Sequence, residues 1–198
     1  MLPQNAPLLM RYSANDPKFP ANDRRAYRRD ISTVWTWRNF ILRFAMSDAI
    51  LVRPIKETDF SAWLPLWSGY NAFYGRHGAT ALDPKITDST WRRFFEPGEP
   101  VFALVAESDG KLSGLTHYLF HRDTTRIELT CYLQDLFTDP SERARGIGTA
   151  LIRGVYEQAR AAGIHCVYWQ THESNATGRR LYDKVSRHLG FLVYEQEL

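Results

Sequence analysis

Three strand-like segments in direct succession limit the folds that this chain of 198 residues can adopt. "VFALVAES" and "LSGLTHYLFHR" are separated by "DGK", which is a strong signal for a β-hairpin with a tight turn. "LTCYLQDLFTD" follows as a third strand and is stopped at Pro140. Residues 101–139 therefore predict neighbouring strands of one sheet, which needs helices to cover its faces.

Helix and strand patterns surround these three strands. Before them, residues 49–55 predict a strand, residues 56–75 a helix with apolar side chains at helical spacing, and residues 87–97 a short helix that starts at a Ser or Thr cap. After them, the chain predicts a helix within 139–163, a strand over 165–171, a helix over 175–189 and a last strand over 191–197. The order β-α-α-β-β-β-α-β-α-β predicts an α/β fold with a mixed sheet and helices on both faces.

The charge is divided unevenly along the chain. Residues 1–45 hold eight Lys or Arg against three Asp or Glu, so the whole-chain totals of 25 and 22 leave 17 and 19 for residues 46–198. We interpret 1–45 as a poorly ordered basic extension and 46–198 as one domain. Two alternatives stay open for the extension: the native chain starts at Met46, or arginines beside Tyr27 and Trp35 contact nucleic acid, a partner that we otherwise do not expect.

Several function classes lack support in the sequence. No stretch approaches the roughly 18 apolar residues of a membrane span, and the N-terminus has no signal-peptide core, so we expect a soluble, cytoplasmic protein without a membrane partner. Cys131 and Cys166 lie far apart without CxxC spacing and predict free thiols. His117 and His121 share a strand face without further ligands at metal-binding spacing, so no metal is expected.

The segment "DPSERARGIGTALIRGVYEQARAAG" (139–163) predicts an anion site. Arg143, Arg145, Gly146 and Gly148 fall where a helix begins, so backbone N–H groups lack helical partners and glycine lets an anion approach them. The residues after Gly146 do not fit a Walker loop, and Leu151 does not fit a dinucleotide fingerprint. The alternative is that these glycines only allow close packing of the helix against a strand.

Two motifs resemble the GNAT superfamily of acyl-CoA N-acyltransferases. Arg143-x-x-Gly146-x-Gly148 after a strand is similar to its pyrophosphate-binding signature. "NATGRRLYDKVSRHLGF" is similar to its second motif, an Asn (Asn175) followed by a Tyr (Tyr182) and a Gly-Phe pair (190–191). Residues 49–198 follow the family's order of elements, and "CYLQDLFTD" with "YLFHR" resembles the group that acetylates histones and polyamines.

The resemblance implies a GNAT fold with a splayed strand pair, and transfer of the acetyl group of acetyl-CoA to a primary amine on a small molecule or a peptide. It implies that Tyr182 is the general acid that protonates the departing thiolate, while Asp135 and Glu173 are candidate general bases. It also implies a set of residues that bind acetyl-CoA: Leu136, Phe137 and Thr138 for the pantetheine arm, then Arg143, Ala144, Arg145, Gly146, Ile147, Gly148, Thr149 and Asn175.

Two departures from the family pattern affect these expectations. Tyr182 and Gly190 are eight residues apart instead of about four, which predicts a longer last helix with Leu181, Val185 and Leu189 on one apolar face. Gln134 stands where the polyamine group often has Glu, and it points away from Asp135 on a regular strand unless a bulge intervenes.

The acceptor side is less well determined by the sequence. The net charge of the domain predicts acids on the acceptor side that favour cationic amines. A homodimer is compatible with the sequence. The alternatives to an enzyme are a non-catalytic acyl-CoA-binding module and nucleic-acid binding through the basic extension.

Overall fold

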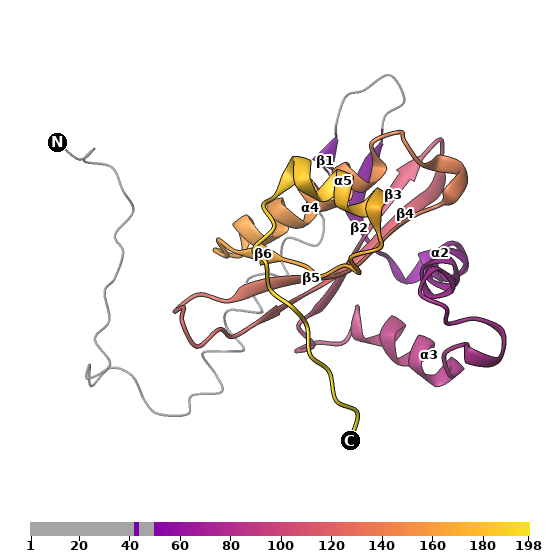
Figure 1. The fold of residues 1–198 in the computed structure, drawn as a ribbon. Coiled ribbons are helices and arrows are strands. Elements are labelled where there is room, and N and C mark those ends of the chain that lie inside the picture. Colours follow the sequence, from indigo (N-terminus) through magenta and orange to yellow (C-terminus); the bar gives the residue numbers. More distant parts are fainter. Residues whose placement is uncertain (1–41, 44–49) are drawn as a thin grey trace.

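The computed structural model describes residues 42–43 and 50–198 of the chain. Six strands form one sheet in sequence order, with antiparallel neighbours from β1 to β5 and β6 parallel to β5 (Figure 1). The expected mixed α/β sheet is therefore confirmed. The strands are β1 (Leu42–Arg43), β2 (Leu51–Pro54), β3 (Val101–Ser108), β4 (Lys111–His121), β5 (Thr130–Thr138) and β6 (Val167–Tyr168).

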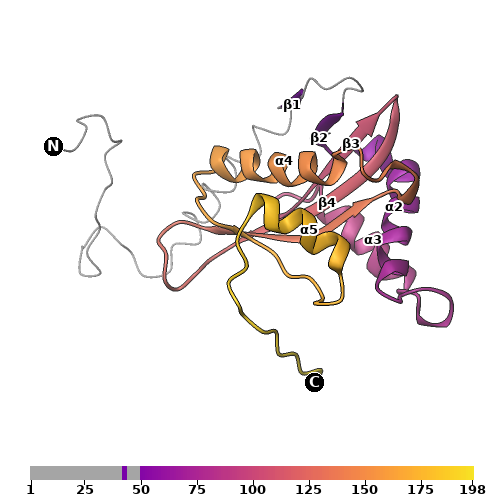
Figure 2. The same cartoon turned by 45° about the horizontal axis from the view of Figure 1, so that its top comes forward.

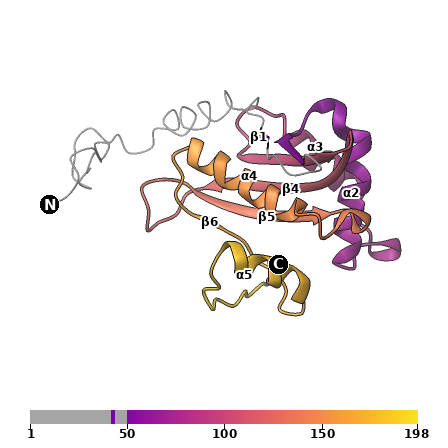
Figure 3. The same cartoon turned by 90° about the horizontal axis from the view of Figure 1, so that it is seen from above.

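Helices cover both faces of the sheet. α4 (Ile147–Ala161) runs along one face with α5 (Ala176–Val185) beside it, and α2 (Phe60–Phe73) and α3 (Pro84–Arg93) cover the other face (Figures 2 and 3). Each face has its own buried cluster. The cluster under α4 centres on Val52, Leu104, Phe120, Leu151 and Val155, and the cluster under α2 centres on Trp63, Phe94, Val105, Leu115 and Phe137.

Local turn and cap chemistry fixes where these elements start and stop. Asp109 and Gly110 both have positive φ (54° and 75°) between the paired residues Ser108 and Lys111, which is the geometry of a two-residue hairpin and confirms the predicted turn. α3 starts earlier than expected, because Asp83 accepts a hydrogen bond from the Lys85 N–H (2.8 Å) and caps the helix in place of a Ser or Thr.

β5 contains a bulge that reverses which face its side chains occupy. The register with β4 pairs His117 with Asp135 and Tyr118 with Leu133, so it skips Gln134. Before the bulge, Leu133 belongs to the cluster under α4; after it, Phe137 belongs to the cluster under α2. Gln134 is exposed and Asp135 is buried. One extra residue has shifted the alternation of the strand.

The C-terminal part of the chain differs from the expectation. β6 spans two residues, and α5 ends at Val185, whose carbonyl oxygen accepts a hydrogen bond from the Tyr156 hydroxyl (3.1 Å). Ser186 is extended, so the predicted longer helix is wrong and Leu189 is exposed. Residues 186–198, all of them described, form neither helix nor strand, so the predicted last strand is also wrong. The alternating apolar residues of 191–197 are compatible with a strand, but this segment pairs with no strand of the described sheet.

The basic N-terminal extension lies mostly outside the described residues. Three points about it therefore stay predictions: that it is poorly ordered, that the native chain starts at Met46 instead, and that it contacts nucleic acid. Leu42 and Arg43 are its described part, and they form β1, which pairs with Val52 and Leu51 of β2. None of the helices in the described residues is long and apolar enough to cross a membrane.

Candidate active site

The bulge in β5 places Asp135 in the aromatic layer beneath α2. The Asp135 carboxylate is 2.9 Å from Nδ1 of His117 on β4, and Nε2 of His117 is 3.0 Å from the indole nitrogen of Trp63 on α2. All three side chains are buried, and Trp63 has no exposed surface. A buried carboxylate is costly unless hydrogen bonds compensate it, so this chain of contacts explains how Asp135 is accommodated.

The direction of these hydrogen bonds fixes the protonation of His117. An indole N–H can only donate, so Nε2 of His117 must accept and carries no proton. Nδ1 then carries the proton of the neutral ring and donates it to the Asp135 oxygen. His117 therefore orients the Asp135 side chain without carrying a charge of its own.

Tyrosine hydroxyls surround Asp135 on its accessible side. Burial raises the pKa of Tyr70 above its ordinary value, and the charge of Asp135 and a hydrogen bond to it act in the same direction. Burial also raises the pKa values of Tyr74 and Tyr132, and the charge of Asp135 raises both further. These three hydroxyls stay protonated near pH 7 and lie within electrostatic range of one carboxylate.

Tyr182 lies across this site on α5, with its ring edge-on to Trp169 (centroids 5.5 Å apart). The pKa of Tyr182 is raised to about 12, chiefly by burial and to a smaller extent by the nearby Tyr74, while the Thr171 hydroxyl acts in the opposite direction. The Thr171 hydroxyl also acts to lower the pKa of Tyr74, which burial raises. Thr171 therefore connects the tyrosine of α5 with the tyrosines that surround Asp135.

Asn175, at the start of α5, caps this helix and orients the Thr171 hydroxyl. Its Oδ1 accepts a hydrogen bond from the Gly178 N–H (3.0 Å), so its Nδ2 faces Thr171 and donates to the hydroxyl oxygen (2.9 Å). Thr171 is thereby left to donate its own proton to a tyrosine oxygen. The structure thus uses the Asn175 side chain as a helix cap and an orienting group. Glu173 is exposed in the preceding turn, where its backbone carbonyl accepts from Arg179 (3.3 Å).

The glycine-containing segment forms the start of α4. Gly146 has φ of 90°, a left-handed conformation that favours glycine, and its carbonyl accepts the first helical hydrogen bond, from Ala150 (3.0 Å). The N–H groups of Ile147, Gly148 and Thr149 therefore point out of the helix start, where an anion can accept from them. Gly148 packs closely instead: an added Cβ would lie 3.0 Å from Leu181 of α5. Gly148 thus allows close packing, mainly against helix α5 and not against a strand, while the anion-binding role of this segment stays a prediction.

The two arginines of this segment differ in their surroundings. Arg143 is exposed, its Nε is 3.4 Å from the Thr138 carbonyl oxygen, and its guanidinium lies 6.0 Å from the Phe137 ring centre. Arg145 pairs with Glu142 and lies 3.6 Å from Asp109. Ala144 between them has a positive φ of 63°. Arg143 therefore offers an anion more uncompensated charge than Arg145 does.

β5 has a free edge between these groups. In the described part of the chain, its pairing with β6 stops at Tyr132 and Tyr168, while β5 itself continues to Thr138. Leu136, Phe137 and Thr138 therefore pair with β4 on one side only, and their other backbone groups face the divergence of the two strands. This is the splayed strand pair that the sequence led us to expect.

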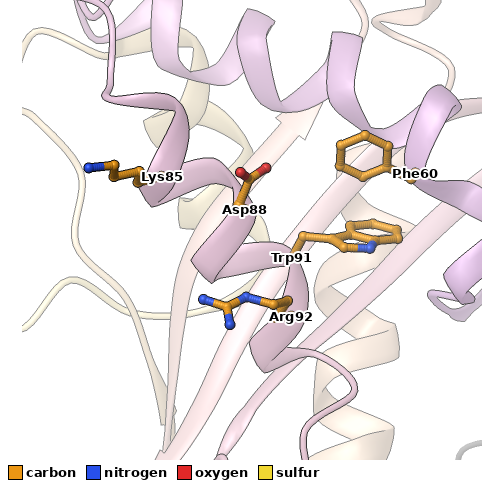
Figure 4. Close-up of a pocket in the computed structure, with 5 residues that line it drawn as sticks. All are labelled: Phe60, Lys85, Asp88, Trp91 and Arg92. Carbon is orange, nitrogen blue, oxygen red and sulfur yellow. The ribbon is translucent and has the colours of Figure 1, made fainter.

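A separate hollow of about 500 Å³ lies outside this site, between α2 and α3. Figure 4 shows the rings of Phe60 and Trp91 together, with Lys85 and Arg92 pointing away from them. Trp63 separates it from the site, because the Trp63 ring lies between Trp91 (4.9 Å) and His117 (6.0 Å). Nothing in this hollow touches Asp135, so it is not the candidate active site.

The remaining singled-out residues have local roles. His121 contacts the Tyr168 hydroxyl (3.0 Å) and the Arg122 carbonyl, and Cys131 and Cys166 are free thiols, the former buried. Within the described residues, no three His, Cys, Asp or Glu side chains gather as a metal site would need. No sequence signal marks Thr171 or Arg76 as site residues, and the apolar spacing of the predicted helix over 56–75 is the only signal for Trp63 and Tyr70.

The buried contact between Trp63 and His117 predicts a measurable stability difference. Trp63→Phe should lower the free energy of unfolding by about 1 kcal/mol or more beyond the loss in Trp67→Phe, because Nε2 of His117 is left without its donor in a water-free site. Trp67 is the matched control, since it is also buried but donates to the partly accessible Thr87 hydroxyl (3.1 Å). Urea unfolding of both variants measures this, and equal losses would contradict it.

Comparison with known proteins identifies the family. Residues 63–191 match the model of the acetyltransferase (GNAT) family. The chain is 31% identical to the D-amino-acid N-acetyltransferase HPA3 of Saccharomyces cerevisiae over 76% of this chain and 92% of the relative. It is 28% identical to the uncharacterized N-acetyltransferase YhfO of Bacillus subtilis over 72% of this chain and 94% of the relative.

Solved structures share the fold at low sequence identity. AAC(6')-Iy, in complex with the bisubstrate analog CoA-S-monomethyl-acetylneamine, is 14% identical with a TM-score of 0.64, over 75% of this chain and 98% of that one. The ribosomal-protein-alanine N-acetyltransferase from Brucella melitensis is 17% identical with a TM-score of 0.61, over 75% and 99%. The chain therefore belongs to the GNAT family of acetyltransferases and is an acetyl-CoA-dependent N-acetyltransferase.

Proposed function

We propose that the chain acetylates a primary amine at the site between Asp135 and Tyr182. The observation that carries this proposal is the connection of these two residues across the divergence of β5 and β6. The rings of Tyr70 and Tyr74 are 5.1 Å apart, both hydroxyls lie within electrostatic range of Asp135, and Tyr182 lies within range of Tyr74 and of the Thr171 hydroxyl. A proton acceptor and a proton donor thus lie on opposite sides of one small site, as transfer to an amine requires.

Asp135 would be the general base. An aliphatic amine has a pKa near 10 and is mostly protonated at pH 7, so it must lose a proton before it can attack. The hydrogen bond from His117 orients the Asp135 carboxylate. Its carboxylate would attract the ammonium group and accept its proton, directly or through a water molecule. Glu173 is a weaker candidate, because its side chain is exposed and no described contact orients it.

Tyr182 would be the general acid. Its pKa of about 12 keeps the hydroxyl protonated at neutral pH, so it is always ready to donate. The Thr171 hydroxyl stabilises the phenolate that remains after donation, because its proton points to a tyrosine oxygen. Tyr182 would protonate the sulfur that departs, which makes the return of the acetyl group unfavourable.

Acetyl-CoA supplies the activated acetyl thioester, and the residues present fit its shape and charge. The N–H groups of Ile147, Gly148 and Thr149 with the side chain of Arg143 would hold the pyrophosphate. Gly146, Ala144 and Arg145 would shape this loop. The free edge of Leu136, Phe137 and Thr138 would pair with the amide groups of the pantetheine arm. Asn175 would act through Thr171 and the start of α5.

Several kinds of primary amine are candidate acceptors. A histone or polyamine acceptor was the narrower expectation, and exposed Gln134 in place of a carboxylate weakens its support. The yeast relative is named for D-amino acids, which also carry a primary amine. We therefore propose a small primary amine as the acceptor; a peptide amine and a homodimer stay predictions.

The proposed function is tested by incubating the protein with acetyl-CoA and a panel of primary amines. Release of free thiol, together with the mass of the acetylated amine, measures transfer. We expect turnover with at least one small primary amine and none with its tertiary analogue. Thiol release that no amine increases would contradict the proposal.

Tyr182→Phe tests the general acid. It keeps the ring and its contact with Trp169 but removes the hydroxyl, so kcat should fall by roughly 10²-fold or more while acetyl-CoA affinity barely changes. In the unmodified protein kcat should not decline between pH 7 and 10, because a hydroxyl with a pKa of about 12 stays protonated throughout. Unchanged kcat in the variant would leave Tyr182 with a packing role only.

Asp135→Asn and Glu173→Gln together test the general base. The first should lower kcat by roughly 10²- to 10⁴-fold, because the amide cannot accept the proton, while the second should leave kcat nearly unchanged. Circular dichroism of both variants controls for folding, since Asp135 is buried. The opposite ranking of the two kcat values would assign the base to Glu173.

Gly146→Asp and Gly163→Asp test the phosphate site at matched backbone positions. The two glycines precede and follow α4, both have positive φ (90° and 71°), and an added Cβ would meet no atom within 4 Å at either. Both variants should lose similar stability from strain, but only Gly146→Asp puts a negative charge at the helix start. Its affinity for coenzyme A should fall about tenfold or more by calorimetry. Equal affinities in the two variants would refute this site.

A further inference from the structure

Arg76 is a cation held beside the proposed base. It follows α2 after Gly75, and its Nε donates to Oδ1 of Asn71 (2.7 Å). Asn71 is itself buried and fixed, because its Nδ2 donates to the Trp67 carbonyl oxygen (2.9 Å). The Arg76 backbone N–H also donates to the Asn71 carbonyl oxygen (2.9 Å). An arginine anchored at both its backbone and its Nε has little freedom to reorient.

The guanidinium lies against the tyrosines of the site. Its central carbon is 5.7 Å from the ring centre of Tyr70 and 5.4 Å from that of Tyr74. Both hydroxyls lie within electrostatic range of Asp135, and Tyr74 also lies within range of Tyr182. The positive charge of Arg76 therefore acts on the same two hydroxyls as the charge of Asp135. It acts to lower their pKa values, against the larger effect of burial.

No carboxylate of the described residues lies within ion-pair distance of Arg76. Other arginines of the fold do have such partners: Arg53 pairs with Asp59 (2.7 Å) and Glu107 (3.0 Å), and Arg145 contacts Glu142 and Asp109. Since Asn71 occupies Nε, the two terminal nitrogens of Arg76 remain, and they form the planar fork that carboxylates bind in two-point fashion.

We propose that Arg76 binds the carboxylate of an α-amino acid acceptor, whose amine is then presented to Asp135; this rests on the proposed function. In an α-amino acid, amine and carboxylate are attached to one carbon, so Asp135 and Arg76, which both influence the Tyr70 hydroxyl, would hold the two groups at once. A polyamine would place a second cation near Arg76 and be repelled. This acceptor class differs from the purely cationic amines that the net charge of the domain led us to expect.

Phenylalanine and phenethylamine test this proposal, because they differ only in the carboxylate. The unmodified enzyme should acetylate at least one enantiomer of phenylalanine with kcat/KM tenfold or more above that for phenethylamine. Arg76→Gln should raise KM for phenylalanine by roughly 10- to 100-fold, with a smaller change in kcat, and leave KM for phenethylamine nearly unchanged. Arg93→Gln is the matched control, since Arg93 is a half-exposed arginine on neighbouring α3 that pairs loosely with Glu99 (4.0 Å).

The outcomes separate this proposal from the proposed function. Turnover of phenethylamine and spermidine that equals or exceeds that of amino acids would overturn the role of Arg76 while supporting amine acetylation. An unchanged KM for phenylalanine in Arg76→Gln would do the same. If a folded enzyme that binds coenzyme A acetylates no primary amine, the proposed function itself fails. Loss of the carboxylate preference in Arg76→Gln, with the preference kept in Arg93→Gln, would support both.

Discussion

The hydrogen-bonded chain from Trp63 through His117 to Asp135 depends on the single bulge at Gln134. Without that extra residue, the alternation of β5 would place Asp135 in the apolar cluster under α4, among Leu133, Leu151 and Val155. Burial of a carboxylate among such apolar side chains is costly. With the bulge, Asp135 meets a histidine that already has a donor on its other nitrogen. The bulge thus converts a position of the core into a position for an ionised group.

The aromatic layer under α2 then serves both stability and the site. Trp63, Trp67 and Tyr70 lie one helical turn apart and stack along the helix, with ring centres 5.7 Å and 5.6 Å apart. The first ring fixes His117, and the last brings its hydroxyl to Asp135. Gly69 leaves room for this layer, since a Cβ there would come within 2.7 Å of the Phe137 ring. The helix can therefore approach β5 closely enough for a tyrosine to reach a strand carboxylate.

Much of the fold could be predicted from the sequence, because its signals are local. The Asp109–Gly110 turn, the three strands of 101–138 and the helix that begins after Gly146 all follow from short patterns. The bulge could not be predicted, since no residue type marks it and it depends on pairing between β4 and β5. The prediction of a last strand was wrong for a related reason. The alternation in 191–197 shows that the segment is able to pair, but whether a strand edge lies next to it depends on the whole fold. Likewise, Thr171 and Arg76 become site residues only through contacts with α2 and α5.

Gly148 connects the two ends of the proposed reaction. Its missing side chain lets Leu181 pack at the start of α4, with the nearest Leu181 carbon only 3.0 Å from where a Cβ would be. The residue after Leu181 is Tyr182, so the position of the hydroxyl is set by the same helix start whose N–H groups would hold the pyrophosphate. Tyr156 of α4 fixes the other end of α5 by donating to the Val185 carbonyl oxygen. A donor for the departing sulfur must stay at a constant distance from the phosphates, because the length of coenzyme A separates the two. Packing α5 onto α4 at both ends provides that constancy, and it explains why position 148, whose N–H would donate to the pyrophosphate, has no side chain on the side that faces Leu181.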